Sequence, residues 1–157
     1  MTTTTERELT HAERNAKAHA ESIEAAHEAY EFCDSGTAKE GRDLSREAKQ
    51  ILREMEYDGT NHQDVVEAIA DQTREAPLSV DVRSGWSTPG QLIAEDFQIL
   101  LSTGGPALRI VGELSHHFEP RRARLEWQDW GTRWTEWADV DPDALLWFAS
   151  HFWFGEA

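Results

Sequence analysis

The sequence has one cysteine, three lysines and no long apolar run, and each of these shortages excludes a class of protein. Because Cys33 stands alone, the chain cannot form an intramolecular disulfide, which is typical of a reducing compartment. No segment approaches the roughly 20 consecutive apolar residues of a membrane-spanning helix, and the N-terminus lacks the basic and apolar regions of a signal peptide. We therefore expect a cytoplasmic protein that does not contact a membrane.

Basic residues are scarce relative to acidic ones. Fifteen Lys and Arg stand against 30 Asp and Glu, which gives a formal net charge of −15. Because this charge repels phosphate groups, we expect no direct binding of nucleic acid. The charge instead favours a basic protein surface as the partner, and many basic surfaces are nucleic-acid-binding sites. The alternative is that the acidity serves only solubility.

The residues that are present suffice for one folded α+β domain. The chain has 157 residues, of which 39% are hydrophobic, and seven are tryptophan; domains of this size usually form one core. We expect a disordered lead over residues 1–5 and a helical part of about three helices over 6–76. An antiparallel sheet of four to five strands with a C-terminal helix is expected over 77–157, continuous with the helical part.

The helical part begins with a segment that lacks Gly and Pro and is rich in Ala and Glu, which predicts one helix over Glu6–Cys33. Gly36 is the predicted stop. Apolar residues recur every seven positions along this segment, at Leu9, Ala16, Ile23 and Tyr30. Such a seam is typical of helix-on-helix packing, either within the chain or in a homodimer.

Two shorter helices are predicted after this first one. Their apolar residues recur at helical spacing over Asp43–Glu56 and Gln63–Glu75. Asp43 is the expected N-cap of the first of them, and Thr60 or Asn61 that of the second.

After Pro77 the apolar period changes from about 3.6 to 2, which indicates strands. The predicted strands are Leu78–Arg83, Phe97–Ser102, Ala107–Leu114 and Arg121–Gln128, then a fifth strand containing Trp134 and Trp137. We expect the first of them to have one buried face, and the second and third to form a hairpin. Asp141 and Pro142 predict the start of a final helix that packs on the sheet.

The clearest candidate for a partner-binding site is a row of four carboxylates on the first helix. Offsets of 0, 3, 7 and 10 place them near one face, at Glu21, Glu24, Glu28 and Glu31. Neighbouring carboxylates in such a row lie about 5–6 Å apart, close to the spacing of phosphates along a nucleic-acid strand. The alternative is an ordinary solvated helix face.

Tryptophans near the predicted last hairpin are a second candidate for the interface. Trp130, Trp134 and Trp137 lie among acidic residues, and tryptophan is enriched at binding hot spots. The alternative is that these rings only fill the core.

The sequence offers no pattern for catalysis, a cofactor or a metal. His11, His19 and His27 are each eight residues apart, so successive rings are rotated by about 80° around a helix and do not converge. No nucleophile motif surrounds a serine or Cys33. We therefore expect no enzyme activity, no cofactor and no metal site.

Three blocks of the C-terminal half, Val82–Trp86, Ile99–Pro106 and Trp127–Thr132, resemble small uncharacterised proteins encoded on phages, plasmids and integrated elements. The resemblance carries no catalytic residues. By association it implies an accessory role such as countering host defence, because anti-CRISPR and anti-restriction proteins are often small, acidic and non-enzymatic.

Two hypotheses follow from these patterns. In the first, the acidic helical part blocks a basic nucleic-acid-binding surface, such as that of a CRISPR effector, by charge mimicry. In the second, the chain is a structural or regulatory protein that dimerises through the helix seam, with its acidity serving solubility alone.

Overall fold

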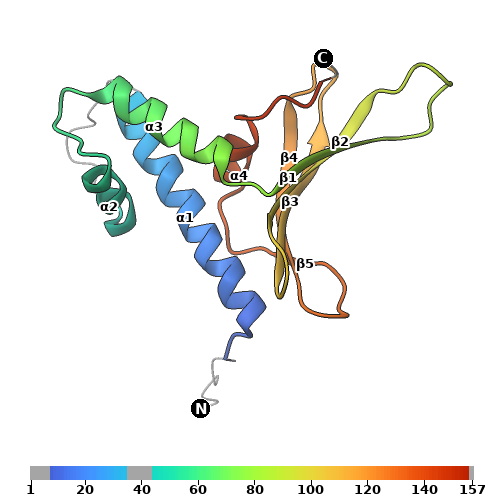
Figure 1. Cartoon of the computed structure of the whole chain (residues 1–157), viewed down its shortest axis with the longest axis horizontal. Coiled ribbons are helices and arrows are strands. Elements are labelled where there is room, and N and C mark those ends of the chain that lie inside the picture. Colours follow the sequence, from blue (N-terminus) through green and yellow to red (C-terminus); the bar gives the residue numbers. More distant parts are fainter. Residues whose placement is uncertain (1–7, 35–43, 156–157) are drawn as a thin grey trace, which may run out of the picture.

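The computed structural model describes residues 8–34 and 44–155 and confirms the α+β class. The described residues form four helices and a five-stranded antiparallel sheet (Figure 1). The lead predicted over 1–5 and the helix stop predicted at Gly36 lie outside the described residues. Within the described part, no helix combines the length and the apolar character needed to cross a membrane.

The elements follow one another in a simple order. The helices α1 (His11–Asp34), α2 (Arg46–Glu54) and α3 (His62–Glu75) precede the strands β1 (Ser79–Ser84), β2 (Ala94–Ser102), β3 (Ala107–Leu114), β4 (Pro120–Gln128) and β5 (Thr135–Trp137), and α4 (Pro142–Ala149) comes last. Each strand pairs with the next one along the chain, so β1 and β5 are the two edges of the sheet.

A reciprocal cap sets the start of α1. Thr10 Oγ1 accepts a hydrogen bond from the Glu13 amide at 3.2 Å, and Glu13 Oε1 accepts one from the Thr10 amide at 3.4 Å. This capping box satisfies amides that have no partner within the helix. The helix therefore begins at His11, and the predicted start at Glu6 was wrong.

The starts of the next two helices also differ from the prediction. Ser45 Oγ accepts a hydrogen bond from the Ala48 amide at 3.1 Å, so α2 begins at Arg46. The predicted cap, Asp43, lies outside the described residues. Asn61 is the N-cap residue of α3, but its side chain accepts a hydrogen bond from the Asp58 amide at 3.0 Å instead of capping the helix.

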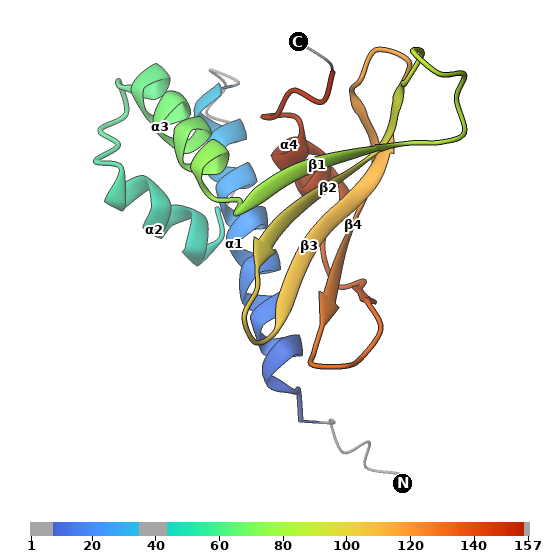
Figure 2. The ribbon, with the colours of Figure 1, turned by 45° about the vertical axis from the view of Figure 1, so that its right-hand side comes forward.

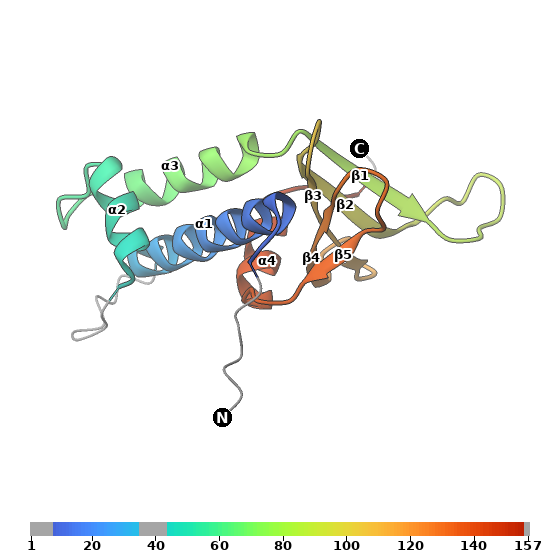
Figure 3. The ribbon, with the colours of Figure 1, turned by 90° about the horizontal axis from the view of Figure 1, so that it is seen from below.

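The main core lies between the sheet and two helices. α1 and α4 cover one face of the sheet, whereas α2 and α3 pack on α1 beside the sheet (Figures 1 and 3). The strands contribute alternate residues that are fully buried, namely Ile99, Leu108, Ile110 and Leu125. A second cluster, which includes Ala29, Cys33, Leu52, Val65 and Ile69, joins α1 to α2 and α3. α1 is thus the element common to both clusters.

The predicted seam of α1 packs within the chain. Ala16 and Ile23 are buried against the sheet and α4, and Tyr30 is half-buried. Leu9 is also half-buried but precedes the helix, so it is not part of a helical seam. The Tyr30 ring lies 5.3 Å from the Trp147 ring of α4. A homodimer through this seam would therefore have to expose part of the core.

β1 does not have the buried face that its alternation predicted. Val80 and Val82 are 38% and 49% exposed, although the register places them on the same side of the sheet as the buried Ile99 and Phe97. The reason is position: β1 is an edge strand, and no residue of it is buried beneath the helices.

Candidate functional site

A groove with a volume of about 900 Å³ lies between α1, the start of α4 and the loop that joins β3 to β4. The ionisable side chains among those that line it are the carboxylates of Glu31, Glu119, Asp141 and Asp143 and the imidazoles of His27 and His117. Neither lysine nor arginine occurs among the described residues of its lining. We call this feature the acidic groove.

The two aspartates of the groove have a local structural reason to be there. Asp141 is the N-cap of α4 and accepts a hydrogen bond from the Asp143 amide at 2.9 Å, as predicted, with Pro142 at the first position of the helix. Carboxylates are favoured at this end of a helix by its dipole. The cap therefore fixes two negative charges at the wall of the groove.

Glu24 joins this acidic group from α1. Its carboxylate accepts a hydrogen bond from the backbone of Asp141 and feels the negative charges of Asp141, Asp139 and Glu21. Burial, followed by these charges, raises the pKa of Glu24 despite the hydrogen bond. Ionisation of Glu24 is therefore less favourable than that of an ordinary glutamate, and a bound cation would offset this cost.

An aromatic cluster forms part of the groove and fixes one of its carboxylates. The His27 ring stacks on Trp147, with 5.2 Å between ring centroids, and His27 Nε2 lies 2.9 Å from Glu31 Oε1. Trp147 Nε1 is buried without a hydrogen-bond partner among the described residues. This packing holds Glu31 near the aspartates of α4.

Trp153 was missed as a site residue by the sequence reasoning. It lines the groove, is 69% exposed, and contacts Phe118 edge-to-face at 6.1 Å. Its neighbour Phe154 is buried against Phe97. The sequence signal for Trp153 is its place next to Phe154 in the short segment after α4. When Phe154 is buried, the side chain before it points outward.

The structure divides the predicted row of glutamates into two pairs. Glu31 lines the acidic groove, and Glu24 accepts a hydrogen bond from the backbone of Asp141 next to it. Glu21 instead lies 4.0 Å from Lys17, and Glu28 accepts a hydrogen bond from the Ser45 amide at 2.8 Å. Residues three apart on a helix differ by about 60° in direction, which is enough to send them to different neighbours.

The three predicted tryptophans lie elsewhere. Trp130 is 81% exposed, but it follows the far end of β4, about 25 Å along the strand from the groove. Trp137 packs against the main core and donates a hydrogen bond to the Asp139 carbonyl at 3.2 Å. Trp134 lies over Arg109, 4.0 Å from its guanidinium carbon.

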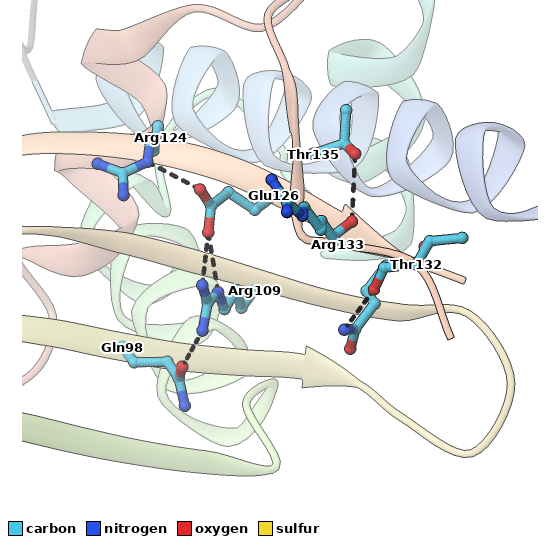
Figure 4. A network of polar contacts seen from close by, with 8 residues as sticks. Gln98, Arg109, Arg124, Glu126, Thr132, Arg133 and Thr135 are labelled. Atoms are coloured by element: carbon cyan, nitrogen blue, oxygen red, sulfur yellow. Dashed lines mark hydrogen bonds and ion pairs between the residues drawn. The ribbon is translucent and has the colours of Figure 1, made fainter. Parts of the chain in front are cut away.

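The open face of the sheet carries a different kind of charge cluster. Arg124 Nε lies 2.9 Å from Glu126 Oε2, and Arg109 Nη2 lies 2.8 Å from Glu126 Oε1 (Figure 4). Arg109 Nη1 also donates to Gln98 Oε1 at 2.6 Å. Burial opposes ionisation of Glu126, but the hydrogen bonds and charges of both arginines outweigh it and lower its pKa.

The charges on this open face are balanced as a whole. A cavity of about 500 Å³ there is lined by the three acids Asp81, Asp96 and Glu113 and by the three arginines Arg83, Arg109 and Arg124. This face therefore lacks the one-sided charge of the acidic groove.

Comparison of the chain with protein-family models, curated proteins and solved structures found no match. Among the described residues, no group of three or more His, Cys, Asp or Glu side chains is placed to hold a metal ion. The single cysteine, Cys33, is buried in the cluster of α1, α2 and α3, and burial raises the pKa of its thiol.

Proposed function

We propose that this is a non-enzymatic binding protein of the cytoplasm whose acidic groove receives a basic segment of another protein. The observation that carries the proposal is the lining of the groove, where the described residues include the carboxylates Glu31, Glu119, Asp141 and Asp143 but neither lysine nor arginine. The exposed Trp153 lies in the same lining, and Glu24 next to the groove adds a further carboxylate, whose pKa is raised by burial and by the neighbouring acids.

The groove would bind by charge and stacking together. Lysine or arginine side chains of the partner would neutralise Glu24, Glu31 and Asp143, and an arginine could also stack on Trp153. The negative field would speed encounter with a basic surface and repel nucleic acid. Binding should weaken as salt is raised, because the Debye length falls from about 10 Å at 0.1 M to about 3 Å at 1 M.

The partner class that we favour is a basic nucleic-acid-binding surface of a host defence protein, such as a CRISPR effector or a restriction enzyme. Occupying that surface with carboxylates would exclude nucleic acid, which is inhibition by charge mimicry. The support for this class is the net charge of −15 and the resemblance of three C-terminal blocks to proteins of mobile elements. Those blocks lie in and next to β1, β2 and β4, outside the groove.

The test is a charge reversal in the groove with a matched control. Glu31→Lys/Asp143→Lys changes two exposed carboxylates of the groove and spares the cap residue Asp141. Glu67→Lys/Glu75→Lys changes the net charge equally on the exposed side of α3. Each protein is used to capture partners from host lysate at low and high salt, and the captured protein is then tested for loss of nucleic-acid binding.

We expect the wild type and the α3 variant to capture the same basic protein at low salt and release it at high salt. The groove variant should lose most of that capture. Equal capture by both variants would show that the groove is not the interface. If neither wild type nor variant retains a basic protein, the alternative that the acidity serves only solubility is favoured.

A further inference from the structure

β1 is an edge strand whose outer side is open. Its inner side pairs with β2, with Val80 opposite Ile99 and Val82 opposite Phe97. Among the described strands, none pairs with its other side (Figure 2). Such an edge presents backbone N–H and C=O groups that can pair with another strand.

Apolar side chains gather along this open edge. Large exposed apolar side chains occur directly before β1, on β1 and in the loop that follows it, namely Leu78, Val80, Val82, Trp86, Leu92 and Ile93. Trp86 is fully exposed, and its loop extends beyond the rest of the sheet (Figure 2). A set of exposed apolar side chains in one region is typical of an interaction site.

The usual protections of an edge strand are weak in β1. Natural edges often carry lysine, proline or a bulge that bends the strand away. Ser79–Ser84 contains neither lysine nor proline, and the register shift near Arg83 places the extra residue, Glu95, on β2. The two charged residues of β1, Asp81 and Arg83, have opposite signs and lie on the same face of the sheet.

We propose that β1 pairs antiparallel with β1 of a second copy of this chain, around a two-fold axis at Val82. In this register, Asp81 of each copy lies opposite Arg83 of the other, so the interface gains two opposite-charge pairs. The registers that place Asp81 opposite itself or Arg83 opposite itself bring like charges together. A shift of one residue in the pairing would set apolar against polar side chains.

The same register covers the exposed apolar residues. Leu78, which is 60% exposed, comes next to Trp86 of the second copy, and Val82 meets Val82. Arg83 binds Asp96 Oδ2 through Nε and Nη2, at 3.2 and 2.7 Å, so its Nη1 takes part in neither bond. That group can donate to Asp81 of the second copy. The dimer would be a continuous sheet that carries two acidic grooves.

This inference is independent of the proposed function, and it can be tested by redesigning the charge pairs. Asp81→Arg gives a strand with two arginines, and Arg83→Asp gives a strand with two aspartates. Each variant repels itself in the proposed register, but the two are complementary to each other. Sedimentation velocity is measured on each chain and on their equimolar mixture at 0.15 M salt, where the Debye length is about 8 Å and limits repulsion by the net charge.

We expect the wild type to dimerise with rising concentration, each variant to be at least about tenfold weaker, and the mixture to recover the dimer. Circular dichroism checks that both variants fold. Hydrogen exchange on the wild type gives a second measurement, in which the amides of Ser79–Ser84 should become protected as the dimer forms.

Two results would overturn the proposal. One is a wild-type chain that stays monomeric up to about 1 mM, the range of the weakest specific complexes. The other is a dimer that both single variants retain, or whose formation leaves the exchange of the β1 amides unchanged, because its interface would then lie elsewhere.

Discussion

The acidic groove and the open face of the sheet are both rich in carboxylates, but their electrostatics are opposite. On the sheet, Glu126 lies between Arg109 and Arg124, and its pKa is lowered. Next to the groove, burial and the charges of Asp141 and Asp139 raise the pKa of Glu24. Ionisation of a glutamate therefore stabilises the folded state at position 126 and destabilises it at position 24.

This difference separates charges that serve stability from charges that are free to bind. A carboxylate held by arginines has already satisfied its hydrogen bonds, so a partner would have to displace them. A carboxylate among other carboxylates gains most when a cation arrives. The comparison predicts that substitutions on the sheet change stability, whereas substitutions in the groove change binding.

The largest expected effect follows from truncating the sheet carboxylate. Glu126→Ala would leave Arg109 and Arg124 without their shared partner, and we expect a loss of about 2–3 kcal/mol in the free energy of unfolding. Urea denaturation measures this loss. The control is Glu113→Ala, whose exposed carboxylate lies 4.0 Å from Arg122 and should contribute under about 0.5 kcal/mol. Equal losses in the two variants would contradict the assigned role of Glu126.

A smaller effect is expected from acid. Because the folded-state pKa of Glu126 is lowered, its contribution to stability is present above its ordinary pKa and is lost as pH falls through the folded value. Glu126→Gln cannot titrate, so its stability should fall less steeply than that of the wild type below about pH 4.5. Urea midpoints of both proteins, measured as the pH is lowered, test whether the stability of the wild type falls more steeply. Parallel curves would show that Glu126 does not have a lowered pKa.

The smallest expected effect on stability, and one of opposite sign, comes from the groove. Because the pKa of Glu24 is raised, its ionisation costs stability at neutral pH. Glu24→Gln should therefore stabilise the free protein by under about 1 kcal/mol, and this gain should fade as pH falls and Glu24 itself becomes protonated. Thermal unfolding at neutral pH measures the gain in stability, and the same measurement at acidic pH shows whether the gain disappears. Glu67→Gln is the control.

The same substitution should weaken binding of a basic partner. A variant that is more stable yet binds less well would identify Glu24 as a residue retained for binding. If Glu24→Gln destabilises the protein at neutral pH, the contrast between groove and sheet does not hold.

Much of the fold could be predicted because it depends on local patterns. The hairpin of β2 and β3 follows from alternating residues around Ser102–Pro106, and the start of α4 follows from Asp141 and Pro142. The capping box of Thr10 and Glu13 is equally local, and it starts the helix later than the absence of Gly and Pro alone predicts.

The candidate site was harder to predict because its residues come from separate elements. Glu24 and Glu31 were identified on α1, but their acidic neighbours at the start of α4 were interpreted only as a helix start. The alternation in Leu78–Arg83 correctly predicts a strand, but the buried face that it predicts is wrong. Alternation along one strand does not show whether the helices cover that strand.

The sequence by itself determined the α+β class, the order of helices and strands and the strong negative charge. These properties depend on composition, on short-range periodicity and on caps a few residues long. Only the tertiary structure decided which carboxylates meet arginines and which meet one another, and which strand lies at the open edge. Those outcomes depend on the packing of α1 and α4 across the sheet, which brings together residues about a hundred positions apart.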